Sequence, residues 1–220
     1  MATIAIIGGH GKVALRLSRL LGESAHEVTS WIRNPNHSSD VEATGSTALV
    51  ADVEALGADE MADRLRGQDA VVWSAGAGGG NPGRTYAVDR DAAIRSMAAA
   101  ATAGTTRYVM VSYFYRRPDH GVPQDSPFFP YAEAKAAADS HLRETGLEWT
   151  ILGPSSLTDD PGTGRITTGE GVTPSRVSRD DVAAVAAYVL EHPATIGRTI
   201  DFNNGETPIA DALEATDAPG

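Results

Sequence analysis

The chain has 220 residues and a mass of 23.0 kDa, and its 41% hydrophobic and 21% charged side chains are the composition of one ordinary globular domain. Its net charge of −11 argues against nucleic acid or an anionic membrane as a partner, because such binders carry a basic patch. The absence of cysteine excludes thiolate nucleophiles, disulfides and cysteine-held zinc or iron–sulfur clusters.

The first half of the chain alternates predicted strands and helices. Short β-branched and apolar runs predict strands, and apolar residues repeated every three or four positions predict helices. In chain order these are a strand at 3–7, a helix at 13–21, strands at 27–32 and 47–50, a helix at 53–65 and a strand at 70–74. Such alternation is typical of a parallel sheet with right-handed crossovers.

The second half continues the pattern. A glycine-rich segment at 75–84 leads into an alanine-rich helix at 85–103, a strand at 108–111 and a loop rich in proline and aromatic residues. Further elements are a helix at 131–143, a strand at 149–152, a helix at 180–190 and a strand at 199–202, with a frayed tail after Asp211. Ser178 and Asp181 resemble a capping box at the start of the 180–190 helix. We expect a single α/β domain, a doubly wound parallel sheet of Rossmann type in three αβα layers.

Small residues occupy the turn between the first strand and the first helix. Gly8, Gly11 and Ala14 form a G-x-x-G-x-x-A spacing there. In a dinucleotide site one glycine permits the sharp turn, another lets the backbone approach a pyrophosphate, and the third small residue lets helix and strand pack closely. The unpaired amides of the helix N-terminus would then receive the phosphates. The turn therefore predicts cofactor contacts from Gly8, Gly11 and their neighbours His10, Lys12 and Val13, although a plain strand-to-helix turn explains the same spacing.

Arg33 follows the second strand, where an acidic residue would favour NAD and a basic one would meet the 2′-phosphate of NADP. The planar guanidinium of arginine suits phosphate, so we expect NADP(H) in preference to NAD(H). A solvated loop arginine is the other interpretation. Asp52 and Val53, after the third strand, are expected to contact the adenine, unless Asp52 is simply the N-cap of the following helix.

A second glycine-rich segment follows the fourth strand, at the sheet edge where open α/β folds bind ligands. Ala75, Gly76 and Ala77 carry little or no side chain, so the backbone there could touch a cofactor. A mobile loop is the competing interpretation.

Tyr131 and Lys135 form a Y-x-x-x-K pair at the start of a predicted helix. Residues four apart share one helix face, so the ammonium group can lie near the phenol and lower its pKa toward the range useful for acid–base catalysis. Ser112 ends the fifth strand and could orient a substrate carbonyl. These residues predict a catalytic group of Ser112, Tyr131 and Lys135. The alternatives are that Lys135 is a solvated lysine on the helix surface and that Ser112 is an ordinary turn residue.

Taken together, these residues resemble a known family. The glycine turn, Arg33, Ser112, the Tyr131–Lys135 pair and the segment at 177–183 look like the atypical short-chain dehydrogenase/reductases, in the NAD(P)H-binding branch that includes biliverdin reductase B-like and nitrogen-metabolite-repressor-like proteins. The resemblance covers about residues 3–203. It implies that a dinucleotide lies across the carboxyl edge, with Ser112 and Tyr131 near the nicotinamide, Lys135 on its ribose and Pro154 beside its amide.

The sequence departs from the family pattern at two places. The helix at 85–103 has no asparagine, although the typical short-chain reductases use one there in a proton relay, and Ser112 is followed by three aromatic residues rather than a small polar one. The resemblance is therefore more specific for the fold and the cofactor than for the reaction.

Aromatic residues gather in the loop after the fifth strand and predict a flat or apolar small-molecule substrate. Six of the 13 lie there: Tyr113, Phe114, Tyr115, Phe128, Phe129 and Tyr131. Packing of the loop onto the sheet is an alternative explanation. Arg116 and Arg117 add local positive charge that could meet an anionic substituent. A small substrate-binding portion is expected at about 153–178 and 203–220.

Three functions remain open from the sequence. The first is an NADP(H)-dependent oxidoreductase that acts on a carbonyl, quinone or flavin-like substrate, with Tyr131 as general acid/base. The others are a non-catalytic NADP(H)-binding redox sensor and a sugar-nucleotide epimerase or dehydratase. We expect no metal, no nucleic-acid or membrane partner, and a monomer or homodimer. Because no run is long enough for a membrane helix and no secretory signal is visible, a cytoplasmic protein is expected.

Overall fold

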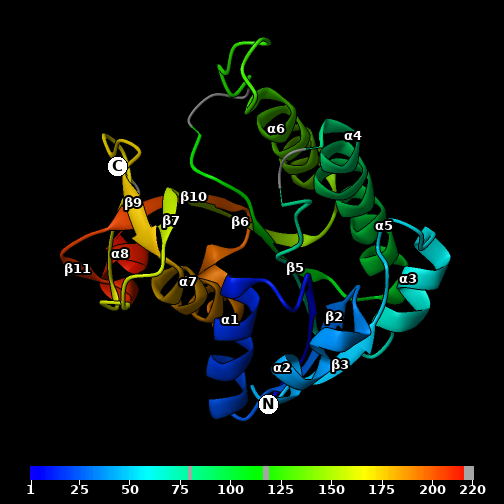
Figure 1. The fold of residues 1–220 in the computed structure, drawn as a ribbon. Helices are drawn as coiled ribbons and strands as arrows, with labels where there is room; N and C mark the ends of the chain where they lie inside the picture. Colours follow the sequence, from blue (N-terminus) through cyan, green and yellow to red (C-terminus); the bar gives the residue numbers. More distant parts are fainter. Residues whose placement is uncertain (79–80, 116–118, 216–220) are drawn as a thin grey trace.

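A nine-stranded, mostly parallel sheet lies between two layers of helices (Figure 1). The structure is a computed structural model and describes residues 1–78, 81–115 and 119–215. The strands of this sheet are β1 Thr3–Ile7, β2 Glu27–Ile32, β3 Thr47–Val50, β4 Ala70–Trp73, β5 Arg107–Val111, β6 Glu148–Pro154, β8 Arg165–Thr168, β10 Arg198–Asn204 and β11 Thr207–Pro208. The short strands β7 Ser156–Thr158 and β9 Arg176–Ser178 pair separately.

The strand order confirms the expected doubly wound fold. Seven parallel strands run in the order β3-β2-β1-β4-β5-β6-β10, and β8 and β11 add antiparallel pairs at one edge. The order reverses between β1 and β4, and open α/β folds bind their ligands outside the carboxyl ends of the strands at such a point. The segments after β1 and β4 are therefore adjacent at the ligand-binding position.

Side chains alternate between the two faces of the sheet, so each face has its own core. The helices are α1 Lys12–Glu23, α2 Ser38–Glu42, α3 Ala58–Leu65, α4 Pro82–Thr85, α5 Ala93–Ala103, α6 Phe129–Glu144, α7 Arg179–Glu191 and α8 Ile209–Glu214, with short 3-10 turns η1 Pro35–His37 and η3 Pro193–Thr195. Ile4 and Ile6 of β1 belong to the core with α1 and α7, whereas Ala5 and Ile7 belong to the core with α3, α5 and α6 (Figure 1).

The helix predicted at 53–65 begins later than expected. Its first residue is Ala58, because the Asp52 side chain accepts the Glu54 amide and folds the preceding residues into a turn. Gly57 is the N-cap, and Glu60 reaches back to its amide. The interpretation of Asp52 as the N-cap of this helix is therefore wrong.

Two other helices, the one predicted at 85–103 and α7, differ from their predictions at the N-terminal end. The helix predicted at 85–103 starts at Pro82 and contains a π-helical segment, η2 Tyr86–Ala92. Ser178 caps α7 as expected, accepting the Asp181 amide at 3.0 Å. The Asp181 carboxylate does not complete a capping box, because it accepts the backbone amides of Thr163 and Gly164 instead.

The segment at 153–178 contains the strands that the sequence analysis missed, β7, β8 and β9. The other expected substrate portion, 203–220, contains β11 and α8, whose buried residues join the core beside α7. Residues 216–220 of that portion lie outside the described residues.

Candidate cofactor and active site

The turn after β1 is shaped by close backbone packing. Gly8 has a φ of +90°, and a Cβ atom on it would lie 2.5 Å from the Cα of Ala75 in the loop after β4. Gly9 is equally confined, since its Cβ would meet the Ser30 side chain at 2.5 Å. The first bond of α1 runs from Leu15 to Gly11, so the amides at the start of α1 have no intrahelical acceptor. This turn presents backbone donors at the switch point, as an anion site requires.

A cavity of about 320 Å³ opens beside this turn. Its walls include nine of the expected cofactor residues: Gly8, His10, Gly11, Arg33, Asp52, Val53, Ala75, Gly76 and Ala77. His10 is fixed by Asp40 at 2.9 Å and by stacking on His37, with ring centroids 3.6 Å apart. The glycine cradle, the α1 amides and the arginine fit the adenosine and phosphate part of a dinucleotide.

Three charged side chains meet on the cavity wall: Arg33 directly after β2, Glu54 in the loop after β3, and Arg84 in α4. Arg33 donates to Oε1 of Glu54 at 3.1 Å, and Arg84 donates to the same oxygen at 2.6 Å. The hydrogen bond from Arg84, with the charges of both arginines, lowers the pKa of Glu54. Arg33 was predicted from the sequence, whereas Glu54 and Arg84 were not, because their proximity to Arg33 depends on the sheet.

Four expected cofactor residues do not line this cavity. Lys12 is exposed and its Nζ pairs with Asp159 at 2.7 Å, while the Val13 side chain is buried, leaving its backbone amide for any cofactor contact. Pro154 is buried at the carboxyl end of β6. Lys135, the fourth, is buried on α6.

Lys135 is directed to the sheet rather than to Tyr131. Its side chain is 1% exposed, and Nζ donates to the Val111 carbonyl at 2.8 Å. No hydrogen bond joins Lys135 and Tyr131, both of which are described residues. The pKa of Tyr131 is raised, by burial first and then by the charges of Asp89 and Asp139, so the predicted lowering is not found. The phenol of Tyr131 thus holds its proton at neutral pH.

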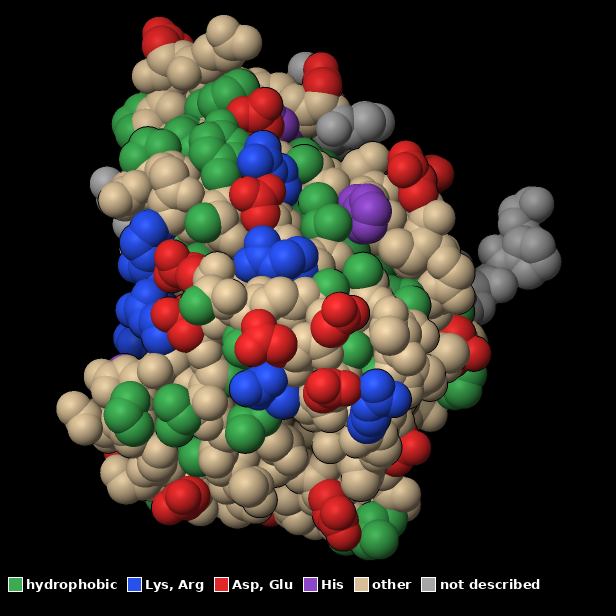
Figure 2. Space-filling view, turned by 90° about the vertical axis from the view of Figure 1, so that its right-hand side faces the viewer, with side chains coloured by type: hydrophobic (Ala, Val, Ile, Leu, Met, Phe, Trp, Pro, Cys, Tyr) green, Lys and Arg blue, Asp and Glu red, His purple; other side chains and the backbone are tan. Residues whose placement is uncertain are grey.

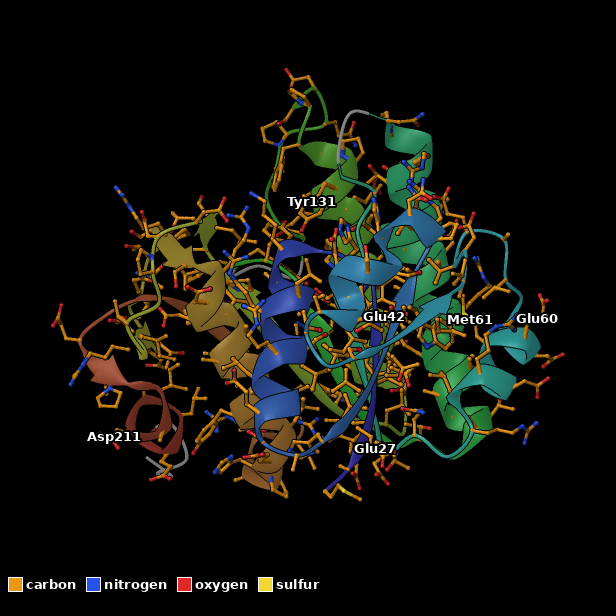
Figure 3. The ribbon with its side chains drawn as sticks, turned by 60° about the horizontal axis from the view of Figure 1, so that its bottom comes forward. Glu27, Glu42, Glu60, Met61, Tyr131 and Asp211 are labelled. Atoms are coloured by element: carbon orange, nitrogen blue, oxygen red, sulfur yellow. The ribbon has the colours of Figure 1, made fainter. Side chains whose placement is uncertain are left out.

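Tyr131 lies in a group of aromatic rings at the carboxyl edge. Its ring centroid is 5.5 Å from Tyr113 and 5.2 Å from Phe128, and Tyr113 stacks on Tyr115 at 4.9 Å. Figure 3 shows Tyr131 at the opposite end of the molecule from Glu27, which begins β2. A second cavity of about 560 Å³, lined by Asn81, Pro82, Thr85, Phe128 and Tyr131 among others, adjoins this ring group. The rings therefore pack on one another and also border an open space.

Ser112 contacts a carboxylate that the sequence analysis missed. Its hydroxyl donates to Oδ2 of Asp139 at 2.5 Å, and the hydroxyl of Tyr115 donates to the same oxygen at 2.9 Å. Burial raises the pKa of Asp139, against the opposing effect of Lys135. Asp139 stands one helical turn beyond Lys135, so extending the Y-x-x-x-K spacing by four residues would have found it.

Asp89 connects the cavity beside the glycine turn with α6. It is 1% exposed on η2 and accepts the amide of Ala77, a cavity residue, at 3.0 Å. Its carboxylate interacts electrostatically with both Lys135 and Tyr131. Asp89 thereby fixes the loop after β4 beside the helix that carries Tyr131.

Some expectations concern the rest of the surface. Acidic and basic side chains alternate on the face that carries α3 to α5 (Figure 2). Among the described residues, no helix is long and apolar enough to span a membrane, and no group of three or more His, Asp or Glu side chains could hold a metal ion. Arg116 and Arg117 lie outside the described residues.

The sequence of this chain matches a known family along most of its length. A model of an NAD(P)H-binding family matches residues 8–193. The chain belongs to this NAD(P)H-binding family. The match includes the glycine turn, both arginines of the cavity and the Tyr131–Lys135 pair, and it agrees with the suspected short-chain dehydrogenase/reductase relationship.

Several known proteins are similar to this chain over almost its full length. A Bacillus subtilis protein named as the uncharacterized sugar epimerase YhfK is 34% identical, covering 95% of this chain and 97% of its own. A Bacillus halodurans structure described as a candidate NAD-dependent epimerase/dehydratase is 31% identical over 98% of this chain and all of its own, with a TM-score of 0.89. The oxidoreductase ylbE from Lactococcus lactis is 29% identical over 97% of this chain and 95% of its own, with a TM-score of 0.86.

Proposed function

We propose that this NAD(P)H-binding protein is an NADP(H)-dependent oxidoreductase that acts on a carbonyl, quinone or flavin-like substrate. The observation that carries the proposal is the position of Asp89, which accepts the amide of Ala77 on the cavity wall and lies on η2, the segment that packs against α6. Its charge also acts on Tyr131 and Lys135 of α6. A cavity for the cofactor beside a helix that carries a proton donor would suit coupled hydride and proton transfer.

The residues around the cavity are proposed to bind the parts of the cofactor as follows. Gly8, His10, Gly11 and the α1 amides of Lys12 and Val13 would hold the phosphates, and Asp52, Val53 and Ala75–Ala77 the adenosine. Arg33 would bind a 2′-phosphate, while Pro154 is proposed for the nicotinamide half. Lys135 is proposed for the same half, where its Nζ would have to exchange the Val111 carbonyl for a ribose hydroxyl. NADP(H), when bound, supplies or accepts a hydride at its nicotinamide ring.

Tyr131 is the proposed proton donor. Its raised pKa keeps the phenol protonated at neutral pH, so a proton is present to be donated, and the same raised pKa makes it a weaker acid than direct pairing with Lys135 would have given. The charge of Lys135 lowers the pKa of both Asp89 and Asp139, against the larger effect of burial, which raises them. Ser112, held by Asp139, is proposed to position the substrate. The ring group of Tyr113, Phe128 and Tyr131 favours a flat or apolar substrate.

The segments at 153–178 and 203–220 are proposed as the substrate-binding portion. The segment at 153–178 is connected to the start of α1 by the Lys12–Asp159 ion pair and to α7 by the Arg179–Asp159 ion pair, at 3.1 Å. These contacts hold the loop after β7 against the N-terminus of α1. A substrate bound next to the nicotinamide would lie near this loop.

The test measures NADPH oxidation by the purified protein with a panel of carbonyls, quinones and flavins. We expect turnover with at least one compound class, and a loss of about 100-fold or more in Tyr131→Phe with unchanged NADPH binding, because general acid catalysis contributes that much. Tyr188→Phe, on α7, removes a hydroxyl away from the site and serves as the control. Binding without turnover across the panel, or full turnover in Tyr131→Phe, would contradict the proposal.

The name of the Bacillus subtilis relative favours a second candidate, epimerase chemistry on a sugar nucleotide. The same Tyr131 would then transfer the proton, and cofactor would be regenerated within each cycle. Incubation with a sugar nucleotide in deuterated water separates the two functions, because both the epimer formed and the NADPH consumed are measured. Epimerisation without net NADPH consumption would favour the second.

A further inference from the structure

The wall of the cofactor cavity contains an anion position that a side chain of the protein already fills. Two guanidinium groups, one from the end of β2 and one from α4, converge on Oε1 of Glu54 at 3.1 and 2.6 Å. Two positive charges repel each other, and the negative charge of Glu54 stabilises their approach to one oxygen. The geometry therefore marks a place where a second anion could be bound by the same two arginines.

The backbone that carries Glu54 is held in place from two sides. The Asp52 carboxylate accepts the Glu54 amide at 3.1 Å, and Arg95 of α5 donates to the Val53 carbonyl at 2.9 Å. The Glu54 side chain is 25% exposed, whereas those of Arg33 and Arg84 are 56% and 39% exposed. The Glu54 carboxylate is thus the most buried of the three charged groups, and the more exposed guanidinium groups of Arg33 and Arg84 have room to turn toward a ligand.

We propose that Glu54 is a specificity-determining residue, whose carboxylate competes with the 2′-phosphate of NADP(H) for Arg33 and Arg84. The inference rests on the proposed dinucleotide function and adds to it the second arginine, Arg84, and the competing carboxylate. A phosphate monoester carries nearly two negative charges at neutral pH and takes bidentate hydrogen bonds from guanidinium groups. The carboxylate keeps the arginines together without the phosphate and weakens the phosphate contact when NADP(H) binds.

The competition predicts opposite effects for the two kinds of substitution. In Glu54→Gln the competing charge is gone and both arginines are free for the phosphate. In Arg84→Gln one of the two phosphate-binding cations is lost. An adenine nucleotide without a 2′-phosphate should respond little to either change, since its other contacts lie at the glycine turn and the adenine wall.

The test compares adenosine 2′,5′-bisphosphate with adenosine 5′-monophosphate by calorimetric titration, so that no nicotinamide and no catalysis are involved. We expect Glu54→Gln to bind the bisphosphate about three- to tenfold more tightly than the wild type, and Arg84→Gln to bind it more weakly by a similar factor. Adenosine 5′-monophosphate should bind all three proteins alike. Asp63→Asn, an exposed carboxylate of α3 paired with Arg66, controls for the change in net charge.

Each possible outcome decides the inference. Unchanged or weaker binding of the bisphosphate to Glu54→Gln, with the wild type binding both nucleotides, would overturn the role of Glu54 and leave the proposed function intact. The same gain in Asp63→Asn would reduce the effect to net charge and also overturn it. If the wild type bound neither these nucleotides nor NADPH, the proposed function would fail together with the inference.

Discussion

Tyr131, Lys135 and Asp139 follow one another at single-turn intervals along α6, yet their polar atoms have different partners. The lysine donates to the sheet, the aspartate accepts two hydroxyls, and the phenol lies among aromatic rings. The expected direct effect of the lysine on the phenol is replaced by an effect on two buried carboxylates. At this scale the helical spacing predicted the shared location correctly and the pairing of polar atoms incorrectly.

Asp139 makes stability depend on pH. Burial raises its pKa in the folded protein above the ordinary value near 4, so the folded state binds the proton more tightly than the unfolded chain. Its contribution to stability is then largest below the unfolded pKa and declines as pH rises through the folded one. We therefore expect the difference in unfolding free energy, Asp139→Asn minus wild type, to grow as pH rises above about 4.

Urea denaturation at a series of pH values measures this difference. The exposed variant Asp63→Asn, which removes one carboxylate and leaves the buried network intact, is the matched control, and the rise for Asp139→Asn should exceed the change that it shows. A rise for Asp139→Asn no larger than the change in this control would show that Asp139 titrates alike in the folded and unfolded chain, contrary to its buried position.

We expect cofactor binding to depend most on the glycine turn after β1. Gly8 combines a φ of +90° with a Cβ position 2.5 Å from Ala75, whereas Gly45 has a similar φ of +85° and open space around it. We expect Gly45→Ala to cost roughly 1–2 kcal/mol of unfolding free energy, from backbone strain alone. Gly8→Ala should cost about 3 kcal/mol or more, because displacement of the β4 loop adds to that strain.

Chemical denaturation of the two variants gives the stability, and NADPH titration gives the binding. Gly8→Ala should lose NADPH binding while Gly45→Ala keeps it. Equal stability losses, with NADPH bound by both, would argue against close packing of the β1 and β4 loops as the basis of the site.

At the scale of elements, the sequence was informative where a strand is buried on both faces. The runs that became β1, β4 and β5 are continuous apolar stretches, and their order alone predicts the parallel sheet. The strands at 156–178 have three or four residues each and few apolar ones, so their pairing arises from tertiary contacts. The late start of α3 follows from the hydrogen bond between the Glu54 amide and the Asp52 carboxylate, which forms a turn that competes with helix formation.

At the scale of the whole molecule, the site is assembled from loops that only the sheet brings together. Nine predicted cofactor residues line one cavity because the ends of β1, β2, β3 and β4 are neighbours in the strand order. Glu54 and Arg84 could not be predicted in the same way, since their significance depends on meeting Arg33 across two strands. Local motifs thus predicted the glycine turn that lines the cavity, and long-range topology brought Glu54 and Arg84 to Arg33.

The central claim, an NADP(H) site at the switch point, is tested most directly by calorimetric titration of the wild-type protein with NADPH and with NADH. The proposed contacts of Arg33 and Arg84 predict one NADPH site per chain and a lower dissociation constant for NADPH than for NADH. Binding of neither dinucleotide, or tighter binding of NADH, would contradict the claim.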